Sequence, residues 1–428
     1  METSRLRWGR RLSDLVGLAL AHRNLTVLLT AIVTMEVVRG IGEIALLPLF
    51  LTEIRGETAS LAGLTITAYL AADVAIRTPA GWLADRLGRK PLVAAGLLLS
   101  LLSLSAMLWV NHKGVFLILN ALLGVGAGMT WPAIYASVAD MYGASQRGLI
   151  MGLLNTVMLG GLASGPIVGN VLVDQLGYTA TFLVCIGLIG GAVVLVALWM
   201  RETRGTHTVA PDWETSWRGL RLLVKGELLL LTLIAVSMTV GMTTILPIIN
   251  LFALHVLKIT LTEMAAIMFV PAVVAAVALV VLGHAADRRG RKPFLVGGMA
   301  ALAVPFLLSP ISTNPLLVML GGTLAGLGYA AAVPAWNAIV MDRITAQSNH
   351  HGLLFGGVAA LQGLGLTVGP ALGGFLWQYV GPYAPLLTVG GIFAVGLALS
   401  AFVSETLRAG EITTPRGAHV GQSGQDFR

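Results

Sequence analysis

Apolar runs of about 20 residues alternate along the chain with short polar and basic segments. A helix rises about 1.5 Å per residue, so each run is long enough to cross the hydrocarbon core of a bilayer, about 30 Å. The runs lack the strict alternation of a membrane-spanning strand, which favours helices. We expect twelve spans, near residues 25–51, 59–83, 91–110, 115–139, 149–172, 178–200, 227–252, 261–284, 293–311, 315–340, 352–377 and 382–403.

The polar segments contain an internal repeat. The stretch from Gly81 to Pro91 returns 202 residues later as Gly283 to Pro293, each time between two apolar runs. A repeat at a constant offset predicts two homologous halves. The expected fold is therefore an all-α polytopic membrane protein with two pseudo-symmetric six-helix bundles. Further matches at similar offsets are Asp140 with Asp342, Pro132 with Pro334, Gly161–Gly169 with Gly365–Gly373, and Gly42…Pro48 with Gly241…Pro247.

The repeat and the polar stretches divide the chain into five parts. Residues 25–200 and 227–404 are the two six-helix bundles, and residues 201–226 form a central cytoplasmic loop. Residues 1–24 form a cytoplasmic N-terminal segment, in which arginines and leucines predict an amphipathic helix on anionic lipid. Within the central loop, Trp213 to Leu223 is a candidate surface helix. Residues 405–428 are polar, and we expect a disordered cytoplasmic tail.

Composition and charge support a membrane location. Apolar residues make up 56% of the chain and charged residues 11%, less than half of the share of about 25% that is usual in soluble domains. With a cytoplasmic N-terminus, cytoplasmic segments hold 22 of the 27 Lys and Arg residues, as the positive-inside rule requires. The net charge of +7 therefore indicates topology rather than nucleic-acid binding, and we expect a multi-pass protein of the plasma membrane with both termini cytoplasmic. The single cysteine, Cys185, excludes an intramolecular disulfide, and no cleavable signal peptide is evident.

Five ionisable residues lie inside the first two predicted spans. Glu36, Arg39 and Glu43 have spacings of three and seven and share one helical face, and Asp73 and Arg77, four apart, share another. Each charge costs about 2.5–3.5 kcal/mol near the bilayer centre, so the five are not expected to face lipid. Placed across a cavity, they form a nearly neutral cluster with one excess acid.

Two interpretations of this cluster remain open. Buried structural ion pairs are common in polytopic proteins. Alternatively, Asp73 or Glu36 is the proton-coupling carboxylate, and Arg39 or Arg77 tunes it or binds an anionic group of the substrate. At the corresponding positions the second half has Ala235, Met238, Met242, Ala275 and Leu279. One polar and one apolar, methionine-lined wall would suit an amphiphile.

Two further residues of span 4 are weaker candidates for the cavity. Trp131, beside Pro132, has the right chemistry to stack on a ring or sugar, although an aromatic residue at this depth is as often part of the packing. Asn120 is a candidate polar contact.

The chain resembles the major facilitator superfamily along essentially its whole length. The family's G-x-x-x-D-R-x-G-R-K loop between spans 2 and 3 is matched by Gly81, Asp85, Arg86, Gly88, Arg89 and Lys90. The G-x-x-x-G-P-x-x-G pattern of its exporters is matched in span 5 by Gly161, Gly165, Pro166 and Gly169, and span 11 repeats it at Gly365, Gly369, Pro370 and Gly373. One departure is Asn120, where proton-driven drug exporters often have an arginine.

The resemblance implies alternating access by two bundles that rock about a central site. It also implies a cytoplasmic gate, in which Asp85 latches onto the N-terminus of span 11 and Arg89 pairs with Asp140. The second loop offers an equivalent set, Gly283, Asp287, Arg288 and Arg291. The alternative is that these basic residues only enforce topology.

These features predict a secondary transporter, monomeric, without cofactor or metal, that uses the proton gradient to export an amphipathic compound. Membrane lipids surround it, and its partners are the substrate and protons. A proton-coupled lipid or glycolipid flippase is the first alternative, because Glu36–Arg39, Asp73 and Trp131 resemble the glycolipid-flippase branch of the superfamily. A transporter of sugars or other solutes is the second. An enzyme is not expected, because none of the eight histidines lies at mid-depth in a span.

Overall fold

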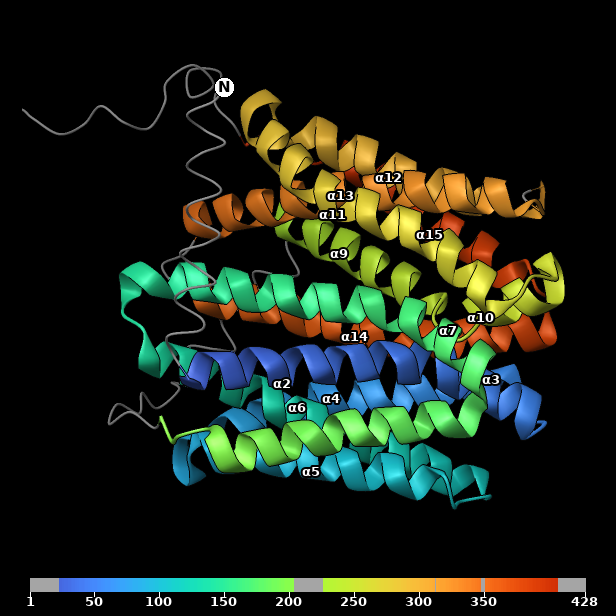
Figure 1. The fold of residues 1–428 in the computed structure, drawn as a ribbon. Helices are drawn as coiled ribbons and strands as arrows, with labels where there is room; N and C mark the ends of the chain where they lie inside the picture. Colours follow the sequence, from blue (N-terminus) through green and yellow to red (C-terminus); the bar gives the residue numbers. More distant parts are fainter. Residues whose placement is uncertain (1–22, 204–225, 312, 348–350, 407–428) are drawn as a thin grey trace, which may run out of the picture.

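The computed structural model describes residues 23–203, 226–311, 313–347 and 351–406, and within these residues it is helical, without strands. The helices form two bundles. Figure 1 shows those of the first half in the lower part of the view and those of the second half in the upper part, with the first arm of α7 (teal) and α14 between them. The predicted fold class, two bundles of membrane-spanning helices, is confirmed. The predicted surface helix lies outside the described residues, as do all but Arg23 of the predicted N-terminal helix and the part of the C-terminal tail beyond Thr406.

The first bundle is built from five stretches of helix, and its first span is distorted by two π-helical segments. In chain order its elements are α2 (Arg23–Gly40), η1 (Ile41–Leu46), α3 (Leu47–Leu49), η2 (Phe50–Ile54), α4 (Ala59–Leu87), α5 (Arg89–Met107), α6 (Lys113–Met141) and α7 (Ala144–Trp199).

The second bundle repeats this plan. Its elements are α9 (Gly226–Thr244), α10 (Ile249–Phe252), η3 (Ala253–Leu257), α11 (Leu261–Arg289), α12 (Arg291–Leu307), η4 (Ser309–Ile311), α13 (Pro315–Gln347), α14 (His351–Tyr379) and α15 (Ala384–Ala401).

Helix α7 supplies two spans. Its 56 residues would extend about 84 Å as one straight helix, far more than a bilayer core of about 30 Å. The chain reverses at Gly177, whose φ of 81° is accessible to glycine at little cost. Figure 1 shows the two arms of α7 as two separate helices, the first teal and the second green at the lower edge of the view.

Ten helical stretches in the described part are long and apolar enough to cross a membrane. The reversal inside α7 and the 17-residue α12 bring the number of spans to the predicted twelve.

Local signals set corresponding helix starts in the two halves. Thr58 caps α4 by accepting a hydrogen bond from Leu61 N, and Thr260 caps α11 in a capping box with Glu263. The threonines are 202 residues apart, so the repeat extends to the caps. Gly88 and Gly290, with φ near 103°, turn the chain into α5 and α12.

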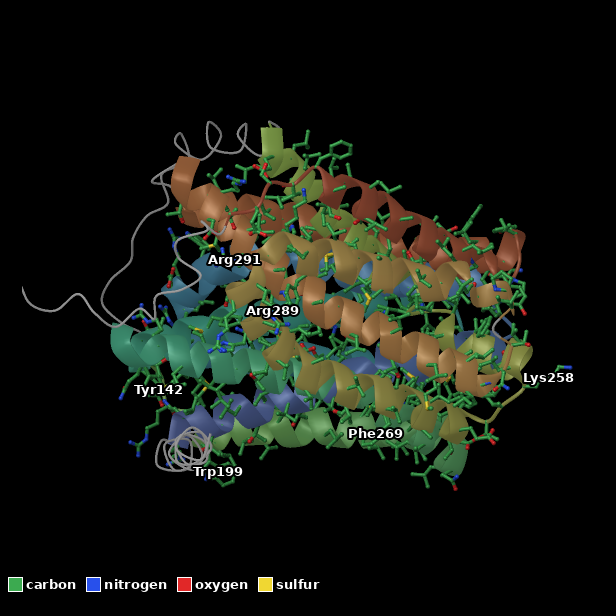
Figure 2. The ribbon with its side chains drawn as sticks, turned by 90° about the horizontal axis from the view of Figure 1, so that it is seen from above. Tyr142, Trp199, Lys258, Phe269, Arg289 and Arg291 are labelled. Carbon is green, nitrogen blue, oxygen red and sulfur yellow. The ribbon has the colours of Figure 1, made fainter. Side chains whose placement is uncertain are left out.

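The two ends of the molecule differ in their contacts. We call the end that carries Gly88 and Gly290 the motif end, and the end that carries Asp174 and Lys258 the opposite end. Figure 2 shows Tyr142, Trp199 and Arg291 toward the motif end and Lys258 at the opposite end.

Glycines let the helices beside the bundle interface pack backbone to backbone. A Cβ on Gly165 would lie 2.6 Å from Val37 O, and a Cβ on Gly369 would lie 2.7 Å from Val240 O. Helices α2 and α7, and α9 and α14, therefore approach more closely than larger residues would allow. The glycines of the span 5 and span 11 patterns that face a neighbouring helix in this way are Gly161, Gly165, Gly169, Gly365, Gly369 and Gly373.

Candidate functional site

Two ion pairs lie inside the first bundle, each within one helix. Arg39 Nη1 is 3.3 Å from Glu36 Oε2, and Arg77 binds Asp73 through two hydrogen bonds of 3.0 and 2.8 Å. Both carboxylates belong to residues that are 1% exposed, whereas the arginine side chains are 20% and 44% exposed. The acids are thus buried against their own bundle and the guanidinium groups extend outward.

The excess acid, Glu43, has a different partner. Asn120 Nδ2 donates to Glu43 Oε2 at 3.1 Å and to Thr65 O at 2.8 Å, which ties span 1 to spans 2 and 4. Glu43 is 4% exposed and Asn120 fully buried. Among the described residues Glu43 makes no ion pair.

A cavity of about 420 Å³ lies between the bundles. The first bundle contributes Arg39 and Glu43 as its charged lining groups, and the second contributes no charged side chain to the lining. Lining residues from the first half are Arg39, Glu43, Ile44, Ile66, Leu70 and Leu162. Those from the second half are Met238, Thr239, Met242, Thr243, Leu246, Tyr329, Val333, Trp336, Asn337, Gln362 and Leu366.

The second wall is more polar than the sequence predicted. Met238 and Met242 line it as expected, but amide groups of Asn337 and Gln362 and hydroxyl groups of threonines lie beside them. The five second-half residues that correspond to charged residues of the first half are all apolar. The neutral polar residues of the second wall lie at other positions, so the repeat could not predict them.

The span 4 candidates lie away from this lining. Trp131 is 5% exposed, belongs to the core of the first bundle and stacks on Tyr135 with ring centroids 5.5 Å apart. The tryptophan that lines the cavity is Trp336, whose Nε1 donates to Leu231 O at 2.8 Å. Asn120 reaches the cavity only through Glu43.

Prolines distort spans 1 and 7 beside the cavity. Pro48 has no N–H, so Ile44 O, four residues earlier, lacks its usual helical donor. Asn250 of the second bundle supplies a replacement, with Nδ2 3.0 Å from Ile44 O. Around Pro247, residues 245–248 form a turn that separates α9 from α10. Broken helices of this kind expose backbone groups where a cavity or a partner can satisfy them.

Hydrogen bonds join the bundles at the opposite end and at mid-depth. Asn170 and Asn250 pair reciprocally at 3.0 and 2.7 Å, and Thr67 Oγ1 donates to Thr367 O at 2.8 Å. Gly63 allows α4 to approach α14, because a Cβ there would clash with Pro370 O. Among the described residues, in contrast, each ion pair at the motif end joins two residues of the same bundle. This conformation is therefore held closed at the opposite end.

The two basic loops have matching ion-pair networks. Arg89 lies 2.9 Å from Asp85 and 2.8 Å from Asp140. Arg291 pairs in the same way with Asp287 and Asp342.

The remaining loop residues also have defined positions. A Cβ on Gly81 would lie 3.9 Å from Pro132 Cβ, and a Cβ on Gly283 would lie 3.4 Å from Pro334 Cβ, so each glycine faces a proline of the neighbouring span. Arg86 lies over the Trp82 ring at 3.9 Å. Arg288 is exposed.

The predicted latch from Asp85 to the start of span 11 stays a prediction, because residues 348–350 and the side chains of residues 351–353 lie outside the described part of the chain. Among the described residues, Asp85 pairs with Arg89 of its own loop.

Sequence reasoning missed two carboxylates that complete these loops. Glu202 accepts hydrogen bonds from Arg89 N and Lys90 N at 2.8 and 3.1 Å, so it caps the N-terminus of α5. A Cβ on Gly88 would lie 2.6 Å from Glu202 Oε2, which explains the glycine at this turn. Lys90 Nζ in return donates to Ala197 O, near the end of span 6, at 2.8 Å.

Glu405 has the same place in the second half. It accepts from Arg291 N and Lys292 N at 3.1 and 3.0 Å, and Lys292 Nζ donates to Ala401 O at 2.8 Å. The signal in the sequence was the Glu-Thr pair that occurs after spans 6 and 12, 203 residues apart.

A family comparison agrees with this architecture. Residues 33–256 and 231–421 match the family model described as Major Facilitator Superfamily. Among solved structures, a variant of the nucleoside transporter NupG has a TM-score of 0.73 at 13% identity, covering 89% of this chain and 98% of that one. The human organic anion transporter MFSD10 (TETRAN) has a TM-score of 0.59 at 17% identity, covering 88% and 99%. These two likenesses show the fold.

Curated relatives are similar over most of their length. Multidrug resistance protein 2 of Bacillus subtilis is 25% identical over 370 residues, 84% of this chain and 90% of that protein. A protein of Staphylococcus saprophyticus named proton-coupled antiporter flippase LtaA is 25% identical over 370 residues, 84% of this chain and 88% of that protein.

Proposed function

Because the chain belongs to the major facilitator superfamily, we propose that this multi-pass membrane transporter exports an amphipathic compound in exchange for protons. The observation that carries the proposal is the central cavity with its unequal walls. One wall presents Arg39 and Glu43, whereas the other presents methionine, aromatic and neutral polar groups. A volume of about 420 Å³ lies within the range of sites for small molecules, roughly 300–1,000 Å³.

Proton coupling is supported by the acids of the first bundle. Glu36, Asp73 and Glu43 are almost fully buried, and two arginines balance two of the three charges. When a carboxylate in such surroundings gains or loses a proton, the change in its charge strongly alters the electrostatic interactions of its neighbours. One relative agrees with this part of the proposal in name, as a proton-coupled antiporter flippase. The name of another, a multidrug resistance protein, agrees with the proposed export.

The test uses the purified protein in liposomes, with ethidium as a cationic amphiphilic probe. An imposed pH difference should drive ethidium against its concentration gradient, and a protonophore should abolish the movement. Ethidium movement that follows only its own gradient would contradict proton exchange. Collapse of an internal pH dye signal upon addition of ethidium would support it independently.

A lipid or glycolipid flippase is the second candidate. The observation that favours it is the pair of amides, Asn337 and Gln362, which can hydrogen-bond a polar headgroup beside apolar lining. A thermal-shift comparison of ethidium with a glycolipid separates the two proposals. The better ligand raises the unfolding temperature more, since saturation at 100 times Kd adds about 2.7 kcal/mol.

The basic residues at the motif end indicate how the protein is oriented in the plasma membrane. We propose that this end faces the cytoplasm, because Arg and Lys side chains concentrate there. Cysteines introduced singly at Glu57 and His284 in a Cys185→Ser background should react with a membrane-impermeant maleimide from opposite sides.

A further inference from the structure

Glu43 occupies a boundary between two cavities. It lines the central cavity of about 420 Å³ and also a small internal cavity of about 20 Å³. The small cavity lies inside the first bundle, and its polar lining comes from Arg39, Glu43, Tyr69 and Ser100. A volume above roughly 10–15 Å³ with several polar partners is enough for one water molecule.

The hydrogen bonds of Glu43 distinguish it from the other two acids. Glu36 and Asp73 each bind an arginine of their own helix, whereas Glu43 Oε2 accepts from the neutral amide of Asn120. Glu43 Oε1, Asn120 Oδ1 and Glu36 Oε1 are buried and have no hydrogen-bond partner within the described part of the chain. Glu43 therefore differs from Glu36 in lacking an ion pair, not in having an unpartnered oxygen. A buried oxygen without a partner is destabilising, and a proton or a water molecule would supply the missing hydrogen bond.

The backbone around Glu43 provides a second, independent indication. Glu43 lies in the π-helical segment η1, Ile41–Leu46, and such segments occur often at functional sites. The next residue, Ile44, presents the carbonyl group that Asn250 of the second bundle binds. The side chain that faces the cavities and the backbone bond that closes the opposite end therefore belong to one distorted turn.

We propose that Glu43 is the group that binds and releases the transported proton, with one water molecule in the small cavity linking it to Arg39 and Ser100. This inference rests on the proposed proton exchange and specifies its site. The carboxylate takes a proton from water on one side of the membrane and returns it to water on the other, and only an O–H bond forms and breaks.

The balance of charges in the cluster explains why Glu43, rather than Glu36 or Asp73, is suited to bind the proton. Glu36, Glu43 and Asp73 carry three negative charges against the two positive charges of Arg39 and Arg77, which leaves one negative charge. A proton on Glu43 makes the cluster neutral without breaking either ion pair. A proton on Glu36 or Asp73 would instead leave Arg39 or Arg77 without its charged partner.

The titratable and charged groups around Glu43 come from three elements. Arg39 precedes it on span 1, Tyr69 faces it from α4 across the small cavity, and Tyr329 of α13 lines the central cavity with it. Glu43 is thus the carboxylate that a cationic amphiphile in the central cavity would meet. Substrate and proton would compete for the same charge.

Infrared difference spectroscopy tests the site without requiring a substrate. Purified protein is titrated with acid, and the carbonyl stretch of protonated carboxyl groups is recorded for wild type, Glu43→Gln, Glu36→Gln and Asp73→Asn. We expect a titrating band in wild type that Glu43→Gln loses and the other two variants keep. Glu57→Gln, a matched change in the loop before α4, is the control.

Two results would overturn the inference: a titrating band that persists in Glu43→Gln, or the lack of any such band in wild type. Glu43→Asp keeps a carboxyl group, so a displaced band in this variant shows that the loss in Glu43→Gln is not misfolding. Asn120→Leu removes the positioning amide and should displace the midpoint of the titration. An unchanged midpoint would exclude that role.

The ethidium assay distinguishes a failure of this inference from a failure of the proposed function. If wild type moves ethidium against its gradient and Glu43→Gln does so equally well, the inference fails and the proposed exchange stands. If wild type shows the titrating band but no proton-driven transport of ethidium or glycolipid, the proposed exchange fails and Glu43 remains a protonation site.

Discussion

The two bundles share their backbone plan but place their ion pairs differently. Within the second bundle, the ion pairs that join two of its described residues lie at the motif end, where Arg291 and Arg343 bind acids. In the first bundle, the equivalent loop network is present, and two more pairs lie within the membrane-spanning helices. The loops are alike because both halves must turn between spans at the membrane surface. The interiors differ because only one wall of the cavity carries charge.

This difference shows which features symmetry imposes. Glycine turns, helix caps and loop ion pairs recur at offsets near 202, since each depends on the local geometry of the chain where one span ends and the next begins. The buried charges recur nowhere in the second half, so packing of a six-helix bundle does not require them. They are therefore the residues with the strongest case for a role in transport.

The largest expected effect comes from breaking an ion pair of the first bundle. Arg77→Ala leaves the buried carboxylate of Asp73 without its counter-charge and should cost about 3–5 kcal/mol. Unfolding in increasing SDS measures the loss. The corresponding second-half change, Leu279→Ala, should cost much less, because this half-buried side chain has no charged partner.

A double variant sharpens this first prediction. Arg77→Ala combined with Asp73→Leu should recover most of the stability, since replacing both partners by apolar groups is often close to neutral. A double variant as unstable as Arg77→Ala would contradict the assignment of the loss to an uncompensated charge.

A smaller effect is expected at the interface between the bundles. Gly63→Val places a side chain against Pro370 O and should destabilise the closed opposite end by about 1–3 kcal/mol. The equilibrium should then shift toward a conformation that is open at this end. Accessibility of a cysteine introduced at Thr367, in a Cys185→Ser background, reports the shift. Unchanged accessibility would contradict the importance of this close approach.

The two missed caps should respond equally to substitution. Glu202→Gln and Glu405→Gln each replace a carboxylate that accepts two backbone N–H bonds from the start of the neighbouring helix by an amide with one acceptor oxygen. Each change should cost about 1 kcal/mol through weaker capping and a less favourable helix dipole. Thermal unfolding of the two variants in one detergent measures both. Losses of unfolding free energy that differ severalfold between the two variants would contradict the structural equivalence of the two caps.

The smallest effect is expected on the second wall of the cavity. Met242→Leu keeps the volume of a partly exposed side chain, so stability should change by less than about 0.5 kcal/mol. Its Kd for ethidium should change by less than about tenfold, since such swaps rarely reach 1.4 kcal/mol. Fluorescence titration measures it. A loss of ethidium affinity well above tenfold would indicate that the apolar wall dominates recognition.

Much of the architecture follows from the sequence alone. The twelve spans, the two halves and the basic loops were predictable because hydropathy, capping and turn chemistry act over a few residues. Even the depth of Glu36 and Asp73 follows from counting along a helix. The Glu-Thr repeat at Glu202 and Glu405 was visible too, but its meaning depended on which helix start it contacts.

Only the tertiary structure decided which groups meet. Glu43 and Asn120 lie 77 residues apart, and Ile44 and Asn250 lie 206 apart. Such contacts depend on how each helix is rotated and tilted against its neighbours, which no local pattern encodes. The same holds for the neutral polar groups of the second wall and for the end at which the bundles close. Both are set by the packing of whole helices across the interface.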